Sequence, residues 1–241
     1  MVNTSTSASA VKQLLRSLLN FLADPHCMLC NAPLEIGEHV VCHRCIADNH
    51  LFDAFQLQVA NNPMERRLYG SCITAASSLM TYQQGEPSQR LIHDLKYNGK
   101  KRIAAFLGKA MAEKIAHSPR YTDIDYVVPV PIHENKQRKR GYNQSELIAA
   151  VIANELHIPL ITDKLSRVSD NMAQASMSLE ERQKTRIEFR LKDKRFFEGK
   201  KVLLIDDVFT TGTTVLNCVE TFTHIKGINI VLYAAASPLG R

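Results

Sequence analysis

The stretch "VLLIDDVFTTGTTV" (202–215) decides the fold class of this chain. Residues 202–205 are continuously apolar, which is typical of a central parallel strand covered on both faces. Asp206 and Asp207 therefore emerge at the carboxyl end of that strand, the edge at which open α/β sheets bind their ligands. The threonine-rich turn that follows opens a helix, and backbone N–H groups at such a turn bind phosphate.

The two halves of this stretch predict one ligand with two chemical features. Two carboxylates repel a phosphate unless they bind a neutral diol or a divalent cation on the same ligand. Hydroxyl and N–H groups of the turn bind the phosphate, and Gly212 allows a close approach that a side chain would forbid. A sugar phosphate satisfies both halves. The phosphate turn consists of Thr210, Thr211, Gly212, Thr213 and Thr214.

The sequence excludes two common nucleotide-binding classes. The chain contains no G-x-x-x-x-G-K-[ST] motif, so the acidic strand does not belong to a P-loop ATPase. No two glycines lie two residues apart, which excludes the G-x-G fingerprint of dinucleotide folds. A buried strand followed by an N-capped helix accounts for one threonine, but not for two acids and four threonines.

Apolar periodicity outlines the rest of the fold. Strand patterns cover 72–82, 126–132, 201–208 and 228–237, and helical patterns cover 86–119, with a turn at Asn98-Gly99, then 145–158 and 213–225. Strands that alternate with helices predict a parallel sheet with crossover helices. With 241 residues, of which 45% are hydrophobic, the chain suffices for one ordinary domain plus an appendage, or for two small domains.

Four cysteines form two C-x-x-C pairs, CMLC and CHRC, which eleven residues separate. This spacing is typical of two knuckles that close a tetrahedral thiolate site around zinc. A closed four-thiolate shell leaves no position for water, so we expect a structural zinc and not a catalytic one. Two disulfides in a secreted protein, or one of His26, His39 and His43 in place of a thiolate, stay alternatives. The expected ligands are Cys27, Cys30, Cys42 and Cys45.

Residues 1–24 carry leucines at helical spacing and predict an amphipathic helix that packs on its own domain. A membrane-surface role for this helix stays an alternative. The segment lacks the uninterrupted apolar region of a secretory signal, and no other segment approaches a transmembrane length. We therefore expect a cytoplasmic protein.

The formal net charge of +6 is concentrated in two segments. Residues 131–145 hold four Lys/Arg and one Glu, and residues 164–201 hold eleven Lys/Arg and six Asp/Glu. Such local basic faces favour an anionic partner, either nucleic acid or a phosphorylated small molecule. A merely solvated surface stays the alternative for each segment. The candidate contacts are Lys136, Arg138, Lys139, Arg140, Arg167, Gln174 and Arg182.

Two short runs add candidate ligand contacts. In "RGYNQ" (140–144), Tyr142 offers a ring for stacking, and Asn143 and Gln144 offer amides for hydrogen bonding. Lys96 and Tyr97 precede the Asn98-Gly99 turn, which is either part of a ligand loop or an ordinary helix end.

The 202–215 stretch resembles the phosphoribosyl pyrophosphate (PRPP) motif of the type I phosphoribosyltransferases. Together with "KYNGKK" (96–101), "VVPVPIHENKQRKRGYNQSE" (127–146) and the cysteine knuckles, it makes the chain from Cys27 onward similar to the ComF competence-protein family, which shares its fold with the gluconate-utilisation protein GntX. The resemblance implies that Asp206 and Asp207 meet the ribose diol and that the phosphate turn takes the 5′-phosphate, with Mg²⁺ bound alongside PRPP.

The same resemblance assigns expected roles to the basic residues and to the whole protein. Residues 136–140 occupy the position of the mobile loop that covers pyrophosphate in the transferases, and Lys96 and Tyr97 are expected on the pyrophosphate side. The resemblance further implies a cytoplasmic protein of natural transformation that acts on incoming single-stranded DNA, with helicase or recombination-loading proteins as partners.

The expected architecture is an α/β fold in three parts: the amphipathic helix (1–24), a small zinc-binding module (25–60), and a parallel-sheet type I phosphoribosyltransferase-like domain (61–241). Three functions stay open. The chain is a DNA-uptake protein with a PRPP-type pocket, an active Mg-dependent phosphoribosyltransferase with catalytic Asp206 and Asp207 and an unknown acceptor, or an adaptor whose zinc module docks a helicase or recombination mediator. We favour the first and third together, because likeness of fold does not establish turnover.

Overall fold

The computed structural model describes residues 26–54, 62–168 and 188–238. The helix predicted over 1–24, the boundary predicted at 60/61, Gln174 and Arg182 lie outside these ranges and stay predictions. The chain divides into two compact units, which we call the knuckle unit (residues up to His50) and the sheet unit (residues from Leu51 on). None of the described helices is long and apolar enough to cross a membrane.

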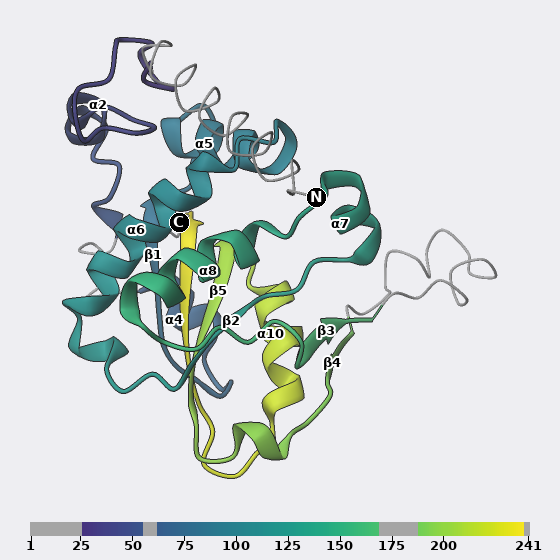
Figure 1. The fold of residues 1–241 in the computed structure, drawn as a ribbon. Helices are drawn as coiled ribbons and strands as arrows, with labels where there is room; N and C mark the ends of the chain where they lie inside the picture. The colour runs from purple at the N-terminus through teal and green to yellow at the C-terminus, as the bar shows by residue number, and fades with distance from the viewer. Residues whose placement is uncertain (1–25, 55–61, 169–187, 239–241) are drawn as a thin grey trace, which may run out of the picture. The chain divides into compact units, whose positions relative to one another are not determined.

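The knuckle unit consists of short local elements (Figure 1). His26 forms an antiparallel bridge with Pro33, and helix α2 (His43–Asp48) begins directly after its cap residue Cys42. Apart from cysteines, the buried apolar side chains among residues 26–50 are Met28, Val40 and Val41. So small an apolar core contributes little to the stability of this unit.

The sheet unit is built on a parallel sheet with the strand order β1-β6-β5-β2 (Figure 1). Every neighbouring pair of strands in this sheet is parallel. The α/β class and the parallel sheet expected from the sequence are therefore confirmed. A separate two-stranded sheet pairs β3 with β4 in antiparallel fashion. The strands are β1 (Ile73–Thr81), β2 (Tyr126–Pro129), β3 (Leu165–Arg167), β4 (Phe189–Leu191), β5 (Lys201–Val208) and β6 (Asn229–Ser237).

Helices connect the strands and cover both faces of the parallel sheet. They are α4 (Pro63–Arg67), α5 (Pro87–Tyr97), α6 (Arg102–Ala116), α7 (Glu134–Arg140), α8 (Gln144–Leu156) and α10 (Thr213–Val219), with the 3-10 helices η1 (Pro119–Tyr121), η2 (Arg195–Phe197) and η3 (Glu220–Phe222). Val202 and Leu204 of β5 belong to one core cluster with Leu68, which follows α4. Leu203 and Ile205 point to the opposite face, where α8 packs on β5 and α6 lies beside α8 (Figure 1).

The basic run 134–140 is a helix, so its prediction as a loop was wrong. His133 caps α7 through its Nδ1 atom, and Gly141 ends the helix in the left-handed conformation at φ 78°. Glu134 lies in the first turn and three cations lie in the last turn, which complements the helix dipole. The residues at the two ends of this run stabilise a helix, which its high charge did not suggest.

The helical patterns elsewhere match the structure with one change. The two helices predicted on either side of Asn98-Gly99 are α5 and α6. The helix predicted over 213–225 is shorter, because α10 ends at Val219 and continues as the 3-10 helix η3. There the hydroxyl of Thr221 donates to the Cys218 carbonyl, and Phe222 enters the core cluster.

Candidate functional site

Two acids lie at the carboxyl end of the central strand β5. Asp206 and Asp207, which we call the acid pair, are both buried, with exposed fractions of 7% and 8%. Their side chains have different partners, since successive side chains of a strand point to opposite faces. Oδ2 of Asp207 lies 3.1 Å from Nζ of Lys96, at the end of α5. Lys96 therefore compensates the charge of Asp207.

A serine that the sequence did not single out positions the acid pair. Ser145 lies in the first turn of α8, directly after the run "RGYNQ". Its hydroxyl donates to Oδ1 of Asp206 at 3.3 Å and accepts from the N–H of Asp207 at 3.1 Å. The available signal was a polar residue at the start of an otherwise apolar helix. That signal does not identify the strand that the serine contacts.

Burial and repulsion raise the pKa of Asp206 to about 7. The larger cause is loss of solvent around the carboxyl group, and the neighbouring charge of Asp207 adds to it. Lys96 and the hydrogen bonds from Asp207 N–H and Ser145 act in the opposite direction. Near neutral pH the Asp206 carboxyl therefore changes charge, and a bound cation stabilises its ionised form.

The phosphate turn presents hydroxyl groups to solvent above a buried ring. Thr210, Thr211 and Thr213 are exposed, and Gly212 has a φ of 84°, in the left-handed region. A Cβ atom at Gly212 would lie 2.8 Å from Cζ of Phe209, whose ring is buried beneath the turn. Both the backbone angle and the space therefore require glycine here.

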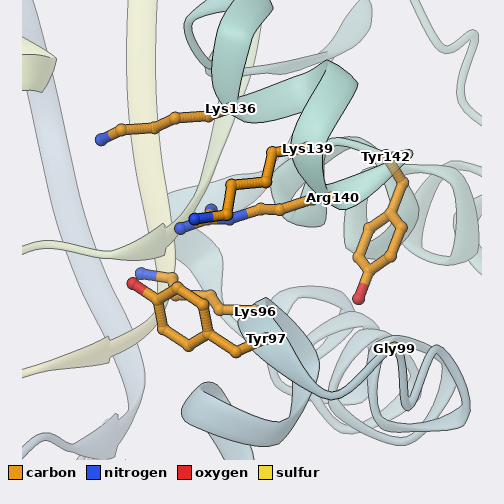
Figure 2. Close-up of a pocket in the computed structure, with 7 residues that line it drawn as sticks. All are labelled: Lys96, Tyr97, Gly99, Lys136, Lys139, Arg140 and Tyr142. Atoms are coloured by element: carbon orange, nitrogen blue, oxygen red, sulfur yellow. The ribbon is translucent and has the colours of Figure 1, made fainter.

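A basic pocket of about 410 Å³ opens between α5 and α7 (Figure 2). Figure 2 shows the amino and guanidinium groups of the basic side chains from the two helices directed toward one space. The guanidinium carbon of Arg140 lies 4.9 Å from the centre of the Tyr97 ring, which is 62% exposed. Lys96 belongs both to this pocket and to the ion pair with Asp207. The lining residues are Lys96, Tyr97, Gly99, Lys136, Lys139, Arg140 and Tyr142.

The structure does not bring every predicted contact residue to this pocket. Arg138 is exposed and pairs with Glu134 at 2.9 Å, one turn away on α7. Tyr142 lines the pocket, but it is largely buried and its hydroxyl donates to the carbonyl of Leu95 (Figure 2). Its ring therefore ties α5 to the start of α8.

The two amides predicted as ligand contacts lie in the interior. Asn143 caps α8 by accepting from Ser145 N–H, and its own amide donates to the carbonyl of Val130. Gln144 is fully buried, and its side-chain oxygen accepts from Arg140 at 2.9 Å. These contacts fix the junction between α7 and α8 beside the acid pair.

Arg167 lies at a different cavity. It ends β3 and lines a space of about 230 Å³ beside the end of β2, together with Pro131 and Glu146. Burial lowers the pKa of its guanidinium group. The basic pocket does not include Arg167.

The four predicted zinc ligands form one cluster in the knuckle unit. Their sulfur atoms all lie within 4.8 Å of one another, and Sγ of Cys30 lies 3.8 Å from Sγ of Cys42. Four ligands at the zinc–sulfur distance of tetrahedral sites place sulfurs about 3.8 Å apart. The N–H groups of Leu29 and Cys42 donate to Sγ of Cys27 at 3.4 Å, which suits a thiolate. The cluster fits a tetrahedral metal ion, and His43 pairs with Glu38 instead of joining it.

Curated relatives of this chain carry names that refer to DNA utilization or to competence. DNA utilization protein YhgH of Escherichia coli K12 is 27% identical over 201 residues, which are 78% of this chain and 86% of that protein. Competence protein F of Haemophilus influenzae is 26% identical over 82% of this chain and 90% of its own length. Competence protein ComFC of Bacillus subtilis is 24% identical over 83% of this chain and 72% of its own length. No protein-family model matches the chain.

Solved structures that match part of the chain include phosphoribosyltransferases. A hypoxanthine phosphoribosyltransferase of Staphylococcus aureus is 13% identical, with a TM-score of 0.36, and the match covers 59% of this chain and 77% of that one. Adenine phosphoribosyltransferase of Leishmania tarentolae is 11% identical, with a TM-score of 0.39, and the match covers 70% of this chain and 93% of that one.

Proposed function

Because the chain is a homologue of competence protein F, ComFC and DNA utilization protein YhgH, we propose that it acts in DNA uptake during natural transformation. In this proposal it works in the cytoplasm and binds incoming single-stranded DNA on the sheet unit. The basic pocket between α5 and α7 is the observation that carries the proposal, because it combines four cations with an exposed tyrosine ring. Single-stranded nucleic acid is bound by this combination of backbone neutralisation and base stacking.

Each side chain of the pocket has a role in this proposal. Lys136, Lys139 and Arg140 neutralise DNA phosphates, while a base stacks on the exposed ring of Tyr97. Arg140 lies over the same ring, so it holds the Tyr97 side chain on which the base stacks and also neutralises a phosphate. Lys96 connects the bound DNA to the acid pair, because its amino group also contacts the carboxylate of Asp207.

The acid pair and the phosphate turn form the second part of the proposal. We propose that the turn holds a 5′-phosphate and that Asp206 and Asp207 meet the ribose hydroxyls of PRPP or of a related 5′-phosphorylated ribose. Carboxylate oxygens are ligands that Mg²⁺ accepts, so a magnesium ion bound with PRPP fits this edge of the sheet. The neighbouring Lys96 and Arg140 are placed to neutralise a diphosphate.

A second candidate function, phosphoribosyl transfer, is favoured by the same neighbouring cations, Lys96 and Arg140. In this reading Mg²⁺ supplies charge compensation to PRPP, Asp207 stabilises positive charge on the ribose ring, and Lys96 and Arg140 hold the leaving pyrophosphate. Calorimetric titration with PRPP and Mg²⁺, and separately with a single-stranded oligonucleotide, distinguishes a metabolite site from a polymer groove. Release of pyrophosphate that depends on an added nucleophilic acceptor, with the phosphoribosyl group recovered on that acceptor, would establish transfer; release without an acceptor would show only hydrolysis of PRPP.

We propose that the cysteine cluster holds a structural zinc ion and that the knuckle unit docks a helicase or recombination-loading partner. Four sulfur ligands at tetrahedral spacing support the metal assignment. A closed thiolate shell gives zinc no reactive position, so its part is to order a small surface for a partner. The two activities are compatible, since DNA binding is assigned to the sheet unit and docking to the knuckle unit.

Replacing Lys136 and Lys139 together by alanine is expected to weaken binding of single-stranded DNA in a salt-dependent way. Both side chains line the basic pocket, and each phosphate contact contributes roughly 0.7 to the slope of log K against log salt. The slope should therefore fall in magnitude by about 1.4 in fluorescence anisotropy titrations from low to high salt.

Arg138→Ala provides the control for this pair, because Arg138 lies on the same helix but pairs with Glu134 outside the pocket. It should leave the slope close to that of the parent. If Arg138→Ala lowered the salt slope by as much as the loss of each pocket lysine does, the DNA would contact a diffuse basic surface. The assignment of the DNA strand to the pocket would then be wrong.

Asp206→Asn is expected to raise the thermal midpoint of unfolding, and to raise it more at pH 8 than at pH 5.5. The pKa of about 7 in the folded protein lies above the usual value of about 4, so the folded state binds the extra proton, and stability falls as pH rises from about 4 to about 7. At pH 8 the parent keeps a buried charge that asparagine lacks, and removing it should gain on the order of a few kcal/mol.

Calorimetric scans of the parent and Asp206→Asn at both pH values measure this difference. Asp193→Asn, at an exposed position, should behave like the parent. An equal gain at pH 5.5 and pH 8 would show that Asp206 does not titrate in this range.

A further inference from the structure

A short segment outside the sequence motifs reaches the phosphate turn. Arg67, the last residue of α4, donates from its guanidinium group to the carbonyl of Thr210. The two residues lie 143 positions apart in the sequence, so no local pattern reveals this contact. Arg67 is exposed, and its charge lies directly beside the turn.

The segment that carries Arg67 is firmly anchored. Met64 and Leu68 are buried in the core cluster. Glu65 accepts from Ala76 N–H and pairs with Arg120, so its charge is already compensated. The outward-facing charge of α4 is therefore positive, and it is held in place by the core beneath it.

A groove follows this segment along α10. The groove has a volume of about 630 Å³, and its lining includes Tyr69, Ser71, Asn217 and Thr223. Tyr69 is 93% exposed, so its ring is accessible for stacking by a ligand. Glu220 also lines the groove, and a carboxylate there makes the space less favourable for a phosphate than for a neutral base.

We propose that Arg67, Tyr69 and the adjoining groove bind the nucleotide that precedes the phosphate held at the phosphate turn. Arg67 neutralises the phosphodiester, the base stacks on Tyr69, and the amide of Asn217 contacts the edge of the base. The DNA strand then crosses the turn and continues toward the basic pocket. This inference rests on the proposed function, since it requires a phosphate at the turn, and it extends the ligand from one nucleotide to a polymer.

Anisotropy titrations with a 3′-labelled ten-residue oligothymidylate test the proposal. Tyr69→Ala should raise Kd about tenfold, within the range of one lost base stack, whereas Tyr69→Phe should bind like the parent. Arg67→Gln should lower the magnitude of the salt slope by roughly 0.7, while Arg66→Gln, an adjacent exposed arginine without the Thr210 contact, should leave it unchanged. Circular dichroism of each variant checks that the fold is retained.

A second arm separates this inference from the proposed function. Tyr69→Ala should leave the affinities for inorganic phosphate and thymidine 5′-monophosphate at parental values, because both ligands end at the turn. Equal losses for the monophosphate and the oligonucleotide would place the base of a mononucleotide in the groove and overturn the polymer path. If Tyr69→Ala and Arg67→Gln both bound the oligonucleotide with parental affinity, the proposed role of the groove would be wrong, and the proposed function would be unaffected. A parent that binds neither phosphate nor DNA would overturn the proposed function itself.

Discussion

Gly212→Val is expected to abolish binding of PRPP and of inorganic phosphate. Gly212 has a φ of 84°, and an added Cβ would lie 2.8 Å from the Phe209 ring. A β-branched residue is strained at this angle, and relieving the contact moves the backbone N–H groups of the phosphate turn. Loss of several charge-assisted hydrogen bonds costs a few kcal/mol, which raises Kd roughly a hundredfold or more by calorimetry.

Gly199→Val separates the effect on the site from general strain. Gly199 also has a positive φ of 67°, but a Cβ there meets no atom within 4 Å, and the residue precedes β5 at the opposite edge of the sheet. This control should lose stability without losing phosphate binding. Parental phosphate affinity in a folded Gly212→Val protein would show that the turn is not the phosphate site, and the function would then lie in the basic pocket and the knuckle unit.

Cys27→Ser is expected to release zinc and to unfold the knuckle unit while the sheet unit stays folded. Cys27 belongs to the sulfur cluster, and the apolar core around it among the described residues is small. Metal binding at such sites supplies about 10–16 kcal/mol of apparent free energy near pH 7, far more than this core provides. Metal analysis should give one zinc per chain for the parent and none for the variant.

Cys72→Ser provides the matched control, because Cys72 belongs to the sheet unit and lies outside the cluster. It should keep one zinc per chain. Limited proteolysis of Cys27→Ser should remove the N-terminal region and leave a resistant fragment that begins near Leu51. Parent protein that contains no zinc when purified without chelator would overturn the zinc assignment.

The sequence predicted the fold class because the relevant signals are local. An apolar run of four residues before Asp206 places the acid pair at the end of a buried strand, and the structure has β5 there. Strand and helix patterns alternate along the chain, which by itself requires parallel pairing. The C-x-x-C spacing likewise identified the cysteine cluster, because each knuckle is formed within a few residues.

Sequence-based predictions were wrong where charged or polar residues were assumed to contact a ligand. Residues 136–140 were expected to form a mobile loop from the resemblance to the transferases, yet they lie in a helix that His133 caps and Gly141 ends. Asn143 and Gln144 are polar residues in a motif, but the structure buries them as a helix cap and an arginine partner. Composition alone does not distinguish a polar residue that meets a ligand from one that satisfies a buried backbone group.

The sequence by itself determined the strands of the parallel sheet and most of the helices, the acids at the strand end, the phosphate turn and the cysteine cluster, because spacing along the chain specifies them. The tertiary structure alone decided which distant residues meet there. Crossover helices bring Lys96 to Asp207 and Ser145 to both acids, and the start of the sheet unit brings Arg67 to Thr210. The physical reason is that such contacts follow from packing helices against a shared sheet edge, and packing depends on the whole core.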